Sequence, residues 1–301
     1  MSTITTNTLA KVKRGVIDKI IVTTPPDHPK QIDAIYGDAP TNNQKYITRD
    51  TVTGFGYAEE IDEDAQISYD VRRRQYSTNW TPVNYVVGWK ITEQAKYNDV
   101  YQIEAQNATE ARNVILDTER KVGALILANG FSGTGGPDAL SLFSTVNGAG
   151  SGNPTYASEF TTPMALSDAA LKAGRYNMRR IKDARNRPRI FTSDLHVVVP
   201  PELEWTLDTL LQSAGQAGTA ENNTNVVKRG LSKLVLDDLT SATNWFMVAK
   251  DKSKHGLFQA VGMPMTSRMQ YDIDVLGTKF AVFKQFVFGW DHSYAIWGSA
   301  A

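Results

Sequence analysis

Residues that could do chemistry are few in this sequence and lie far apart. The four histidines are His28, His196, His255 and His292, and none has the spacing of a metal-binding pair such as HExxH. His196 precedes a short apolar run, so we expect it to pack in the interior instead of binding a metal. The chain has no cysteine, which excludes disulfide bonds and thiolate ligands.

Two further kinds of active-site motif are also missing. The stretch 133–136 reads GTGG but lacks the Gly-Lys-Ser/Thr ending of a phosphate-binding loop and the strand-then-helix context of a dinucleotide site. No GxSxG motif singles out a serine nucleophile. We therefore expect no catalytic residue, no cofactor and no metal. An enzyme whose site is dispersed along the sequence is the alternative that motifs cannot detect.

What remains are two clusters of charge. The basic cluster occupies the segment 175–189 and consists of Arg175, Arg179, Arg180, Lys182, Arg185, Arg187 and Arg189. Only Asp183 opposes it, and Arg175, Arg179 and Lys182 have the three- and four-residue spacing of one helix side. One interpretation is a solvated surface near a helix C-terminus, where cations are favoured. The other is a patch that binds an acidic neighbour or packaged nucleic acid.

The acidic cluster lies earlier in the chain and consists of Glu59, Glu60, Asp62, Glu63 and Asp64. Three cations, Arg72, Arg73 and Arg74, follow it closely. Crowded carboxylates cost free energy unless cations are near. These three arginines could supply the cations from the same segment, or the basic cluster could supply them from a neighbouring subunit.

Composition limits what these clusters can mean. Lys+Arg and Asp+Glu each number 32 among 301 residues, so the net charge is zero, whereas nucleic-acid binders usually have a basic excess. Hydrophobic residues make up 41%, enough for a sizeable core in one large domain or two closely packed ones. The first 22 residues lack the apolar core of a signal peptide, and no run of about 18 apolar residues would span a membrane.

The first third of the chain predicts an arm, a ribbon and a long helix. Prolines interrupt residues 1–46, which we expect to lie on another subunit. Residues 47–92 predict a two-stranded hairpin, whose return strand has apolar residues at every second position from Val83 to Ile91. A helix over 93–129 would be about 55 Å long. Thr92 is its expected cap, and Asn129 with Gly130 marks its end.

The remainder predicts a mixed α+β region. Residues 132–163 predict loops that can include a short hairpin, and residues 168–184 predict a helix capped by Ser167. A buried strand at 196–199 is followed by a helix to about residue 213 and a flexible loop at 214–225. Strands are expected at 226–236, 245–249, 263–275 and 280–290.

Several short segments, in this order, resemble the major capsid proteins of tailed bacteriophages. They are GPDALSLFST at 136–145, VVVPPELEWT at 197–206, NTNVVK at 223–228, DL at 238–239, WF at 245–246, HGL at 255–257, FGW at 288–290 and WGS at 297–299. Together with the order of the predicted elements they cover about residues 47–301. The resemblance implies the α+β fold of the Hong Kong 97 type.

The resemblance also implies a division of the chain. It places the N-terminal arm at 1–46 and the E-loop at 47–92. A peripheral domain with the spine helix would take 93–189 and 263–290, and an axial domain 190–262 and 291–301. The chain begins at Met1 without the cleaved scaffold segment of the type member, which implies a separate scaffold protein. Lys45 and Lys90 flank the hairpin, but no motif matches them to the type member's crosslinking site.

The function implied is a shell of pentamers and hexamers around a double-stranded DNA genome, with the protein assembled in the host cytoplasm and located in the virion. Besides its own copies, the implied partners are a scaffold protein, a portal, a decoration protein and weakly contacted DNA, with no membrane. The two charge clusters are the candidate contacts between subunits. An encapsulin-like bacterial compartment is the alternative with the same fold.

Overall fold

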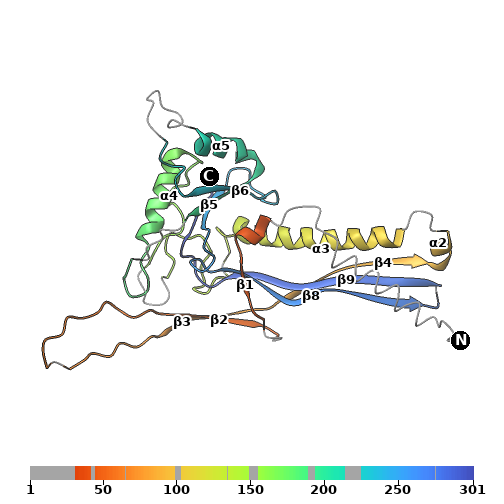
Figure 1. Ribbon diagram of the computed structural model, residues 1–301, viewed down its shortest axis with the longest axis horizontal. Coiled ribbons are helices and arrows are strands. Elements are labelled where there is room, and N and C mark those ends of the chain that lie inside the picture. The colour runs from red at the N-terminus through yellow and green to blue at the C-terminus, as the bar shows by residue number, and fades with distance from the viewer. Residues whose placement is uncertain are drawn as a thin grey trace.

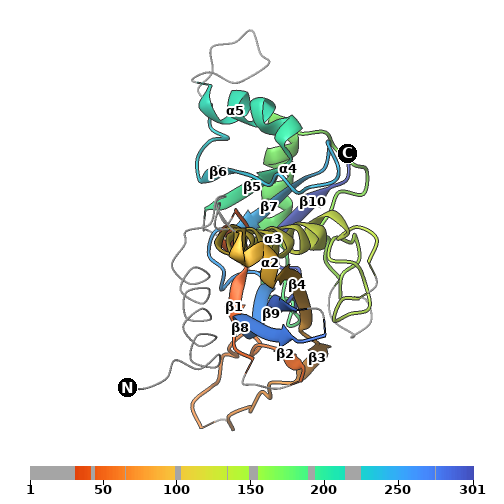
Figure 2. The ribbon, with the colours of Figure 1, turned by 90° about the vertical axis from the view of Figure 1, so that its right-hand side faces the viewer.

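The computed structural model describes residues 31–41, 45–64, 66–98, 103–133, 135–148, 155–188, 194–213, 225–274 and 276–301. Figure 1 shows a long first unit of sheet and helix, a second unit standing on one end of it, and a thin ribbon that projects below. Figure 2 looks along the first unit and shows the second unit stacked above the long helix.

A four-stranded sheet forms the base of the first unit. Its strands, in spatial order, are β1 (Gly37–Ala39), β8 (Leu257–Asp272), β9 (Gly277–Trp290) and β4 (Val83–Thr92). Only the β1–β8 pair is parallel. The alternation predicted for β4 is confirmed, because Tyr85 stacks on Phe286 and Trp89 on Phe280, across the pairing with β9. These rings share one face of the sheet, and helix α3 covers that face.

The long helix is shorter than its sequence pattern predicts. Helix α2 (Glu93–Tyr97) begins at the Thr92 cap, whose hydroxyl accepts a hydrogen bond from the Ala95 amide, and it ends at Asn98. Helix α3 spans Ile103–Ala128, about 39 Å at 1.5 Å per residue, and stops before Asn129 as expected. Its buried stripe consists largely of small residues such as Ala108, Ala111 and Ala124, which let the helix lie close to the sheet. Val100, a predicted member of that stripe, lies outside the described residues.

The second unit is built on another four-stranded sheet. The strands, in spatial order, are β10 (Ile296–Ser299), β7 (Trp245–Ala249), β5 (Leu195–Val199) and β6 (Leu231–Val235). The predicted buried strand at 196–199 is confirmed, and it is apolar on both sides for a structural reason. Val197 and Val199 belong to the cluster under the helices of this unit, whereas Val198 belongs to the cluster shared with α3 and β9. The strand therefore joins the two units.

Two helices cover the outer face of this sheet. Helix α4 (Asp168–Arg180) begins at Ser167, whose hydroxyl caps the Ala170 amide as predicted, and it ends four residues before the predicted end at 184. A short 3-10 turn, η2 (Pro201–Leu203), leads into α5 (Glu204–Gln212). The side chains of Leu171, Met178 and Leu207 pack with Trp245 and Trp297 in one core.

The ribbon is the third part of the structure. Strands β2 (Ile47–Val52) and β3 (Arg74–Trp80) pair with each other and enclose a loop, residues 53–73, whose described part contains no strand. The predicted return strand at 83–91 is β4, which pairs with β9 instead of β2. The prediction that residues 83–91 pair with the outgoing strand of the ribbon was wrong. Their half-buried alternation also fits the edge of the first sheet, where they lie beside β9.

Packing differs from the predicted division of the chain at three other points. Residues 31–39 carry the 3-10 turn η1 (Gln31–Ala34) and β1, and bury Ile32, Ile35 and Tyr36 in the core instead of lying on another subunit. Helix α4 belongs with the second sheet and not with the unit of the long helix. Strand β8 runs without a break through residue 263, the predicted domain boundary.

Candidate assembly surface

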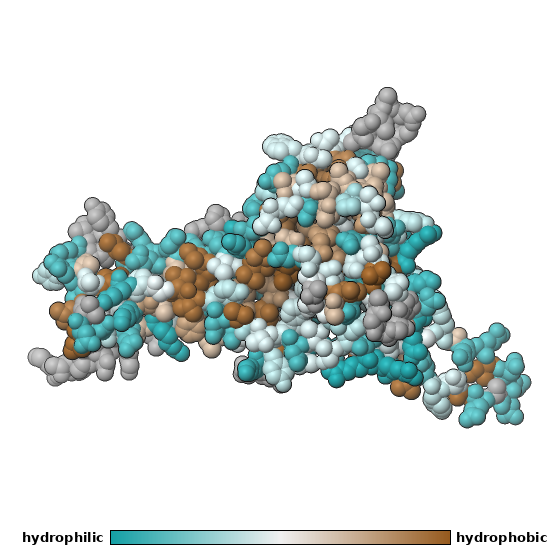
Figure 3. Space-filling model, turned by 180° about the vertical axis from the view of Figure 1, so that it is seen from behind, coloured by the Kyte–Doolittle hydropathy of each residue, from teal (hydrophilic) through white to brown (hydrophobic). Residues whose placement is uncertain are grey.

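The ribbon loop, residues 53–73, exposes apolar side chains that a free protein would normally bury. Phe55, Tyr57, Ile67, Tyr69 and Val71 are 54%, 70%, 60%, 85% and 64% exposed. The acidic cluster from Glu59 to Asp64 lies on the same loop and is exposed throughout. Figure 3 shows hydrophobic and hydrophilic side chains side by side at this projecting end. Large apolar side chains exposed together on one segment favour a site of interaction.

The root of the ribbon is anchored on the body. The Arg49 guanidinium donates to Asp291 Oδ2 at 2.7 Å and lies 4.9 Å from the ring centroid of Phe258. The Trp80 ring, at the end of β3, packs on Trp290 with centroids 5.3 Å apart. A Cβ on Gly289 would stand 2.7 Å from the Trp80 ring, so only glycine lets the ribbon approach so closely here.

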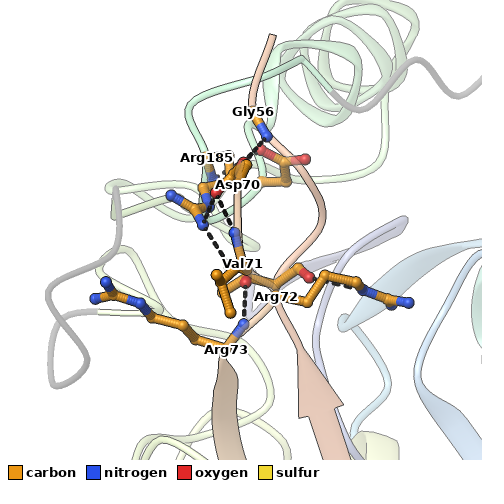
Figure 4. Close-up of polar contacts among 8 residues, drawn as sticks. Gly56, Asp70, Val71, Arg72, Arg73 and Arg185 are labelled. Atoms are coloured by element: carbon orange, nitrogen blue, oxygen red, sulfur yellow. Dashed lines mark hydrogen bonds and ion pairs between the residues drawn. The ribbon is translucent and has the colours of Figure 1, made fainter. Parts of the chain in front are cut away.

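A second contact ties the loop itself to the body. Arg185 Nη2 donates to Asp70 Oδ1 at 2.8 Å and to the Val71 carbonyl at 2.8 Å (Figure 4). The other carboxylate oxygen of Asp70 accepts from the Gly56 amide across the loop at 2.7 Å. The Gly56 amide and the Arg185 guanidinium together hold the pKa of the Asp70 carboxyl below its usual value.

The predicted basic cluster divides between two structural settings. Arg175, Arg179 and Arg180 lie on α4, where Arg175 donates to the Arg229 carbonyl and Arg180 lies 4.2 Å from the ring centroid of Tyr176. Lys182, Arg185 and Arg187 follow the helix in a loop, so Lys182 does not continue the helix side as predicted. Arg189 lies outside the described residues.

The three arginines after the acidic cluster have other partners than those predicted. Arg74 pairs with Asp50 and also donates to Ser77, both within the paired strands. Arg72 donates to the Thr53 carbonyl at 3.3 Å and lies 6.0 Å from the ring centroid of Phe55. Arg73 is held through its backbone amide by the Thr53 hydroxyl. In the described part of the ribbon, the contacts found for these arginines therefore do not involve the acidic cluster.

Asp50 and Asp70 are the acids that sequence reasoning missed. Each stands alone in the sequence and carries no clustering signal. The pairing of β2 with β3 brings Asp50 beside Arg74, and the return of the loop toward α4 brings Asp70 beside Arg185. Neither proximity follows from local spacing.

The structure describes three of the four histidines, His196, His255 and His292. Among the described residues no three His, Cys, Asp or Glu side chains gather as a metal ion would require. His196 is half-buried and its Nδ1 lies 2.9 Å from the Ser232 hydroxyl. Burial lowers the pKa of His255 to about 4, with the nearby His292 as a further cause. His28 lies outside the described residues.

Comparison with known proteins decides to which family the chain belongs. A family model described as phage capsid protein matches residues 75–297. The chain belongs to the phage capsid protein family. It is a major capsid protein, a subunit of a viral shell.

Solved structures agree with the capsid protein in fold. The capsid of a native GTA particle is 13% identical with a TM-score of 0.59, covering 93% of this chain and 94% of that one. The mature capsid of bacteriophage PhiM1 is 10% identical with a TM-score of 0.57, covering 92% and 88%. A virus-like particle from Pyrococcus furiosus is 12% identical with a TM-score of 0.52, covering 96% and 98%. The expected fold of the Hong Kong 97 type is confirmed.

No curated protein matches the capsid protein in sequence. Within the described ranges, no helix is both long and apolar enough to cross a membrane. The family match is to a phage shell protein, which favours that function over the encapsulin-like compartment and over an enzyme.

Proposed function

We propose that this capsid protein forms pentamers and hexamers that close into an icosahedral head, and that the ribbon loop is the element by which each subunit holds its neighbour. The observation that carries this is the exposed apolar loop on a ribbon anchored firmly at its root. Six of its large hydrophobic side chains face solvent in a single subunit, and a neighbouring copy would cover them.

The acidic cluster supports the same role. Its five carboxylates at 59–64 are exposed, and the α4 cations Arg175, Arg179 and Arg180 are at least partly exposed. We propose that the acidic cluster of one copy lies near these cations, with Lys182, on the next. Arg185 is engaged by Asp70 of its own chain and contributes through that contact instead.

The division of the chain that we propose follows packing. The N-terminal arm keeps only residues before 31, which lie outside the described residues, and 47–80 form the ribbon that acts as E-loop. The first sheet with α2 and α3 is the peripheral unit, and the second sheet with α4 and α5 is the axial unit. The loop 214–225, of which only Asn225 is described, is proposed to meet its copies at the five- and six-fold axes. A density map of the shell that placed this loop far from every axis would contradict the assignment.

The remaining partners follow from the proposed role. A separate scaffold protein, a portal and a decoration protein would act during and after assembly in the host cytoplasm. DNA would be enclosed by weak, nonspecific contacts, as the zero net charge allows. The subunit itself would have a structural role and no catalytic one.

Electron microscopy of the purified protein tests the proposal. Expressed with its scaffold, the full chain is expected to yield closed shells whose maps show the ribbon loop over an adjacent subunit. Shells from an infection should contain DNA, whereas shells filled with an enzyme would indicate a compartment. Subunits that never form shells under any of these conditions would refute the proposal.

A further inference from the structure

The ribbon touches the body of its own subunit at two places with open space between them. At the root, Arg49 and Trp80 anchor the paired strands. Beyond the root, a cavity of about 240 Å³ lies between the ribbon strands and the body, lined on the body side by Asp138 and Tyr156 among others. At the base of the unpaired loop the ribbon meets the body again, where Asp70 pairs with Arg185. That pair is therefore well placed to control the direction of the loop.

The body presents Arg185 from a preorganised turn. The Asp183 carboxylate accepts hydrogen bonds from the backbone amides of Arg185 and Arg187, both at 2.9 Å, and from the Arg187 guanidinium at 3.0 Å. Burial alone would raise the pKa of Asp183, but these hydrogen bonds lower it, so the carboxylate stays ionised. Asn186 completes the turn in the left-handed region at φ 60°. The side chain of Arg185 thus leaves a fixed backbone.

The ribbon passes this turn at close range. A Cβ on Gly54 would stand 2.3 Å from Arg187 Nη2, which is itself held by Asp183. Arg185 extends from the turn to the loop and donates hydrogen bonds to both the Asp70 carboxylate and the Val71 carbonyl (Figure 4). One side chain therefore fixes two consecutive residues of the loop.

We propose that Asp70 and Arg185 form a latch that sets the direction in which the ribbon loop leaves its own subunit. The inference rests on the proposed function, in which the loop docks on a neighbouring copy. The described residues of the loop 53–73 form no strand, so without the latch the loop would sample many directions. Docking would then have to order it, and preorganisation removes that cost. Arg185 is a positioning residue for the loop.

Distances between two labels test the latch directly. The chain has no cysteine, so Ala58→Cys on the loop and Ala242→Cys on the body, both exposed, allow specific spin labelling. Labelled subunits would be diluted into an excess of unlabelled ones, so that only distances within one chain are measured by double electron–electron resonance. We expect a narrow distance distribution in the parent and a broad one in Asp70→Asn and in Arg185→Gln.

The controls separate the ion pair from general damage. Arg185→Lys keeps the charge and should retain a distribution narrower than that of Arg185→Gln. Lys172→Gln removes an exposed cation of α4 that has no part in the proposed docking, and it should leave the parent distribution unchanged. The double variant of Asp70→Asn and Arg185→Gln should be no broader than Arg185→Gln alone, because Arg185→Gln already removes the contact with Asp70. Equally narrow distributions in the parent and in both single variants would overturn the latch, and so would equal broadening by Lys172→Gln.

Assembly is measured separately, so that failure of the latch and failure of the proposed function can be distinguished. By light scattering, the latch variants should assemble about 2- to 10-fold more slowly, the equivalent of ordering one or two side chains. Their finished shells should look normal by microscopy. A broad distribution with an unchanged assembly rate would show that the latch exists but that the loop is not the docking element. A narrow distribution with slow assembly would refute the latch and leave the proposed function standing.

Discussion

Glu119 carries a carboxylate into the space between α3 and the first sheet, where Lys284 and Gln259 donate hydrogen bonds to it. The side chains of Glu119 and Lys284 are only 5% and 11% exposed. Removing one partner of a buried pair leaves a charge without compensation. We expect Lys284→Met to lower the free energy of unfolding by about 3–5 kcal/mol. Adding Glu119→Gln to Lys284→Met should recover part of the lost free energy of unfolding, as measured by urea unfolding of unassembled subunits. A double variant less stable than Lys284→Met would contradict this account.

His255 is expected to make stability depend on pH. It is 4% exposed, and burial lowers its pKa from 6.5 to about 4 in the folded chain. His292 and Lys252 also lower this pKa, whereas Asp251 and Asp291 raise it. Between pH 6.5 and about 4 the unfolded chain binds a proton that the folded chain does not, so acid destabilises the fold.

The size of the His255 effect follows from linkage. Above pH 6.5 the lowered pKa does not reduce the free energy of unfolding. As the pH falls from 6.5 to about 4, the free energy of unfolding decreases by up to about 3 kcal/mol, because each pKa unit corresponds to about 1.4 kcal/mol. In His255→Gln that loss should be absent, so the curve of unfolding free energy against pH should be flatter in this window. Parallel curves for the two proteins would show that His255 does not titrate as described.

At the scale of elements, the ribbon combines a rigid base with an unpaired, charged loop. Replacing the five carboxylates at 59–64 with amides should leave the fold of the subunit intact, because they are exposed. Each exposed ion pair contributes only about 0–1 kcal/mol, but the contribution is repeated in every subunit of a shell. We therefore expect weaker shell formation in the amide variant, followed by light scattering.

Salt provides the control for that variant. Charges are screened over about 8–10 Å at physiological ionic strength, so added salt should slow assembly of the parent more than assembly of the amide variant. If both proteins assembled equally and responded equally to salt, the acidic cluster would be only a solvated part of the loop.

At the scale of the whole molecule, two units share one core, and residues from the predicted N-terminal arm are part of that core. Removing residues 1–40 would take away Ile32, Ile35 and Tyr36, of which Tyr36 donates to the Gly123 carbonyl at 2.7 Å. We expect that deletion to prevent stable folding. Removing only 1–30 spares those residues, and should give folded subunits that fail to close into stable shells, as seen by sedimentation and microscopy. Normal particles from the shorter deletion would show that the arm does not hold neighbours.

The sequence by itself determined helices such as α4 and α5 and strands such as β5 and β7, where the caps Thr92 and Ser167 begin helices, and to which family the chain belongs. These are properties of local periodicity and of short motifs. Only the tertiary structure decided that β4 pairs with β9, that α4 covers the second sheet, and that Asp70 meets Arg185. Backbone hydrogen-bonding groups are the same at nearly every residue, so a strand pattern shows which side is buried but not which strand lies beside it. The partner is set by the apolar area that the whole chain can bury at once.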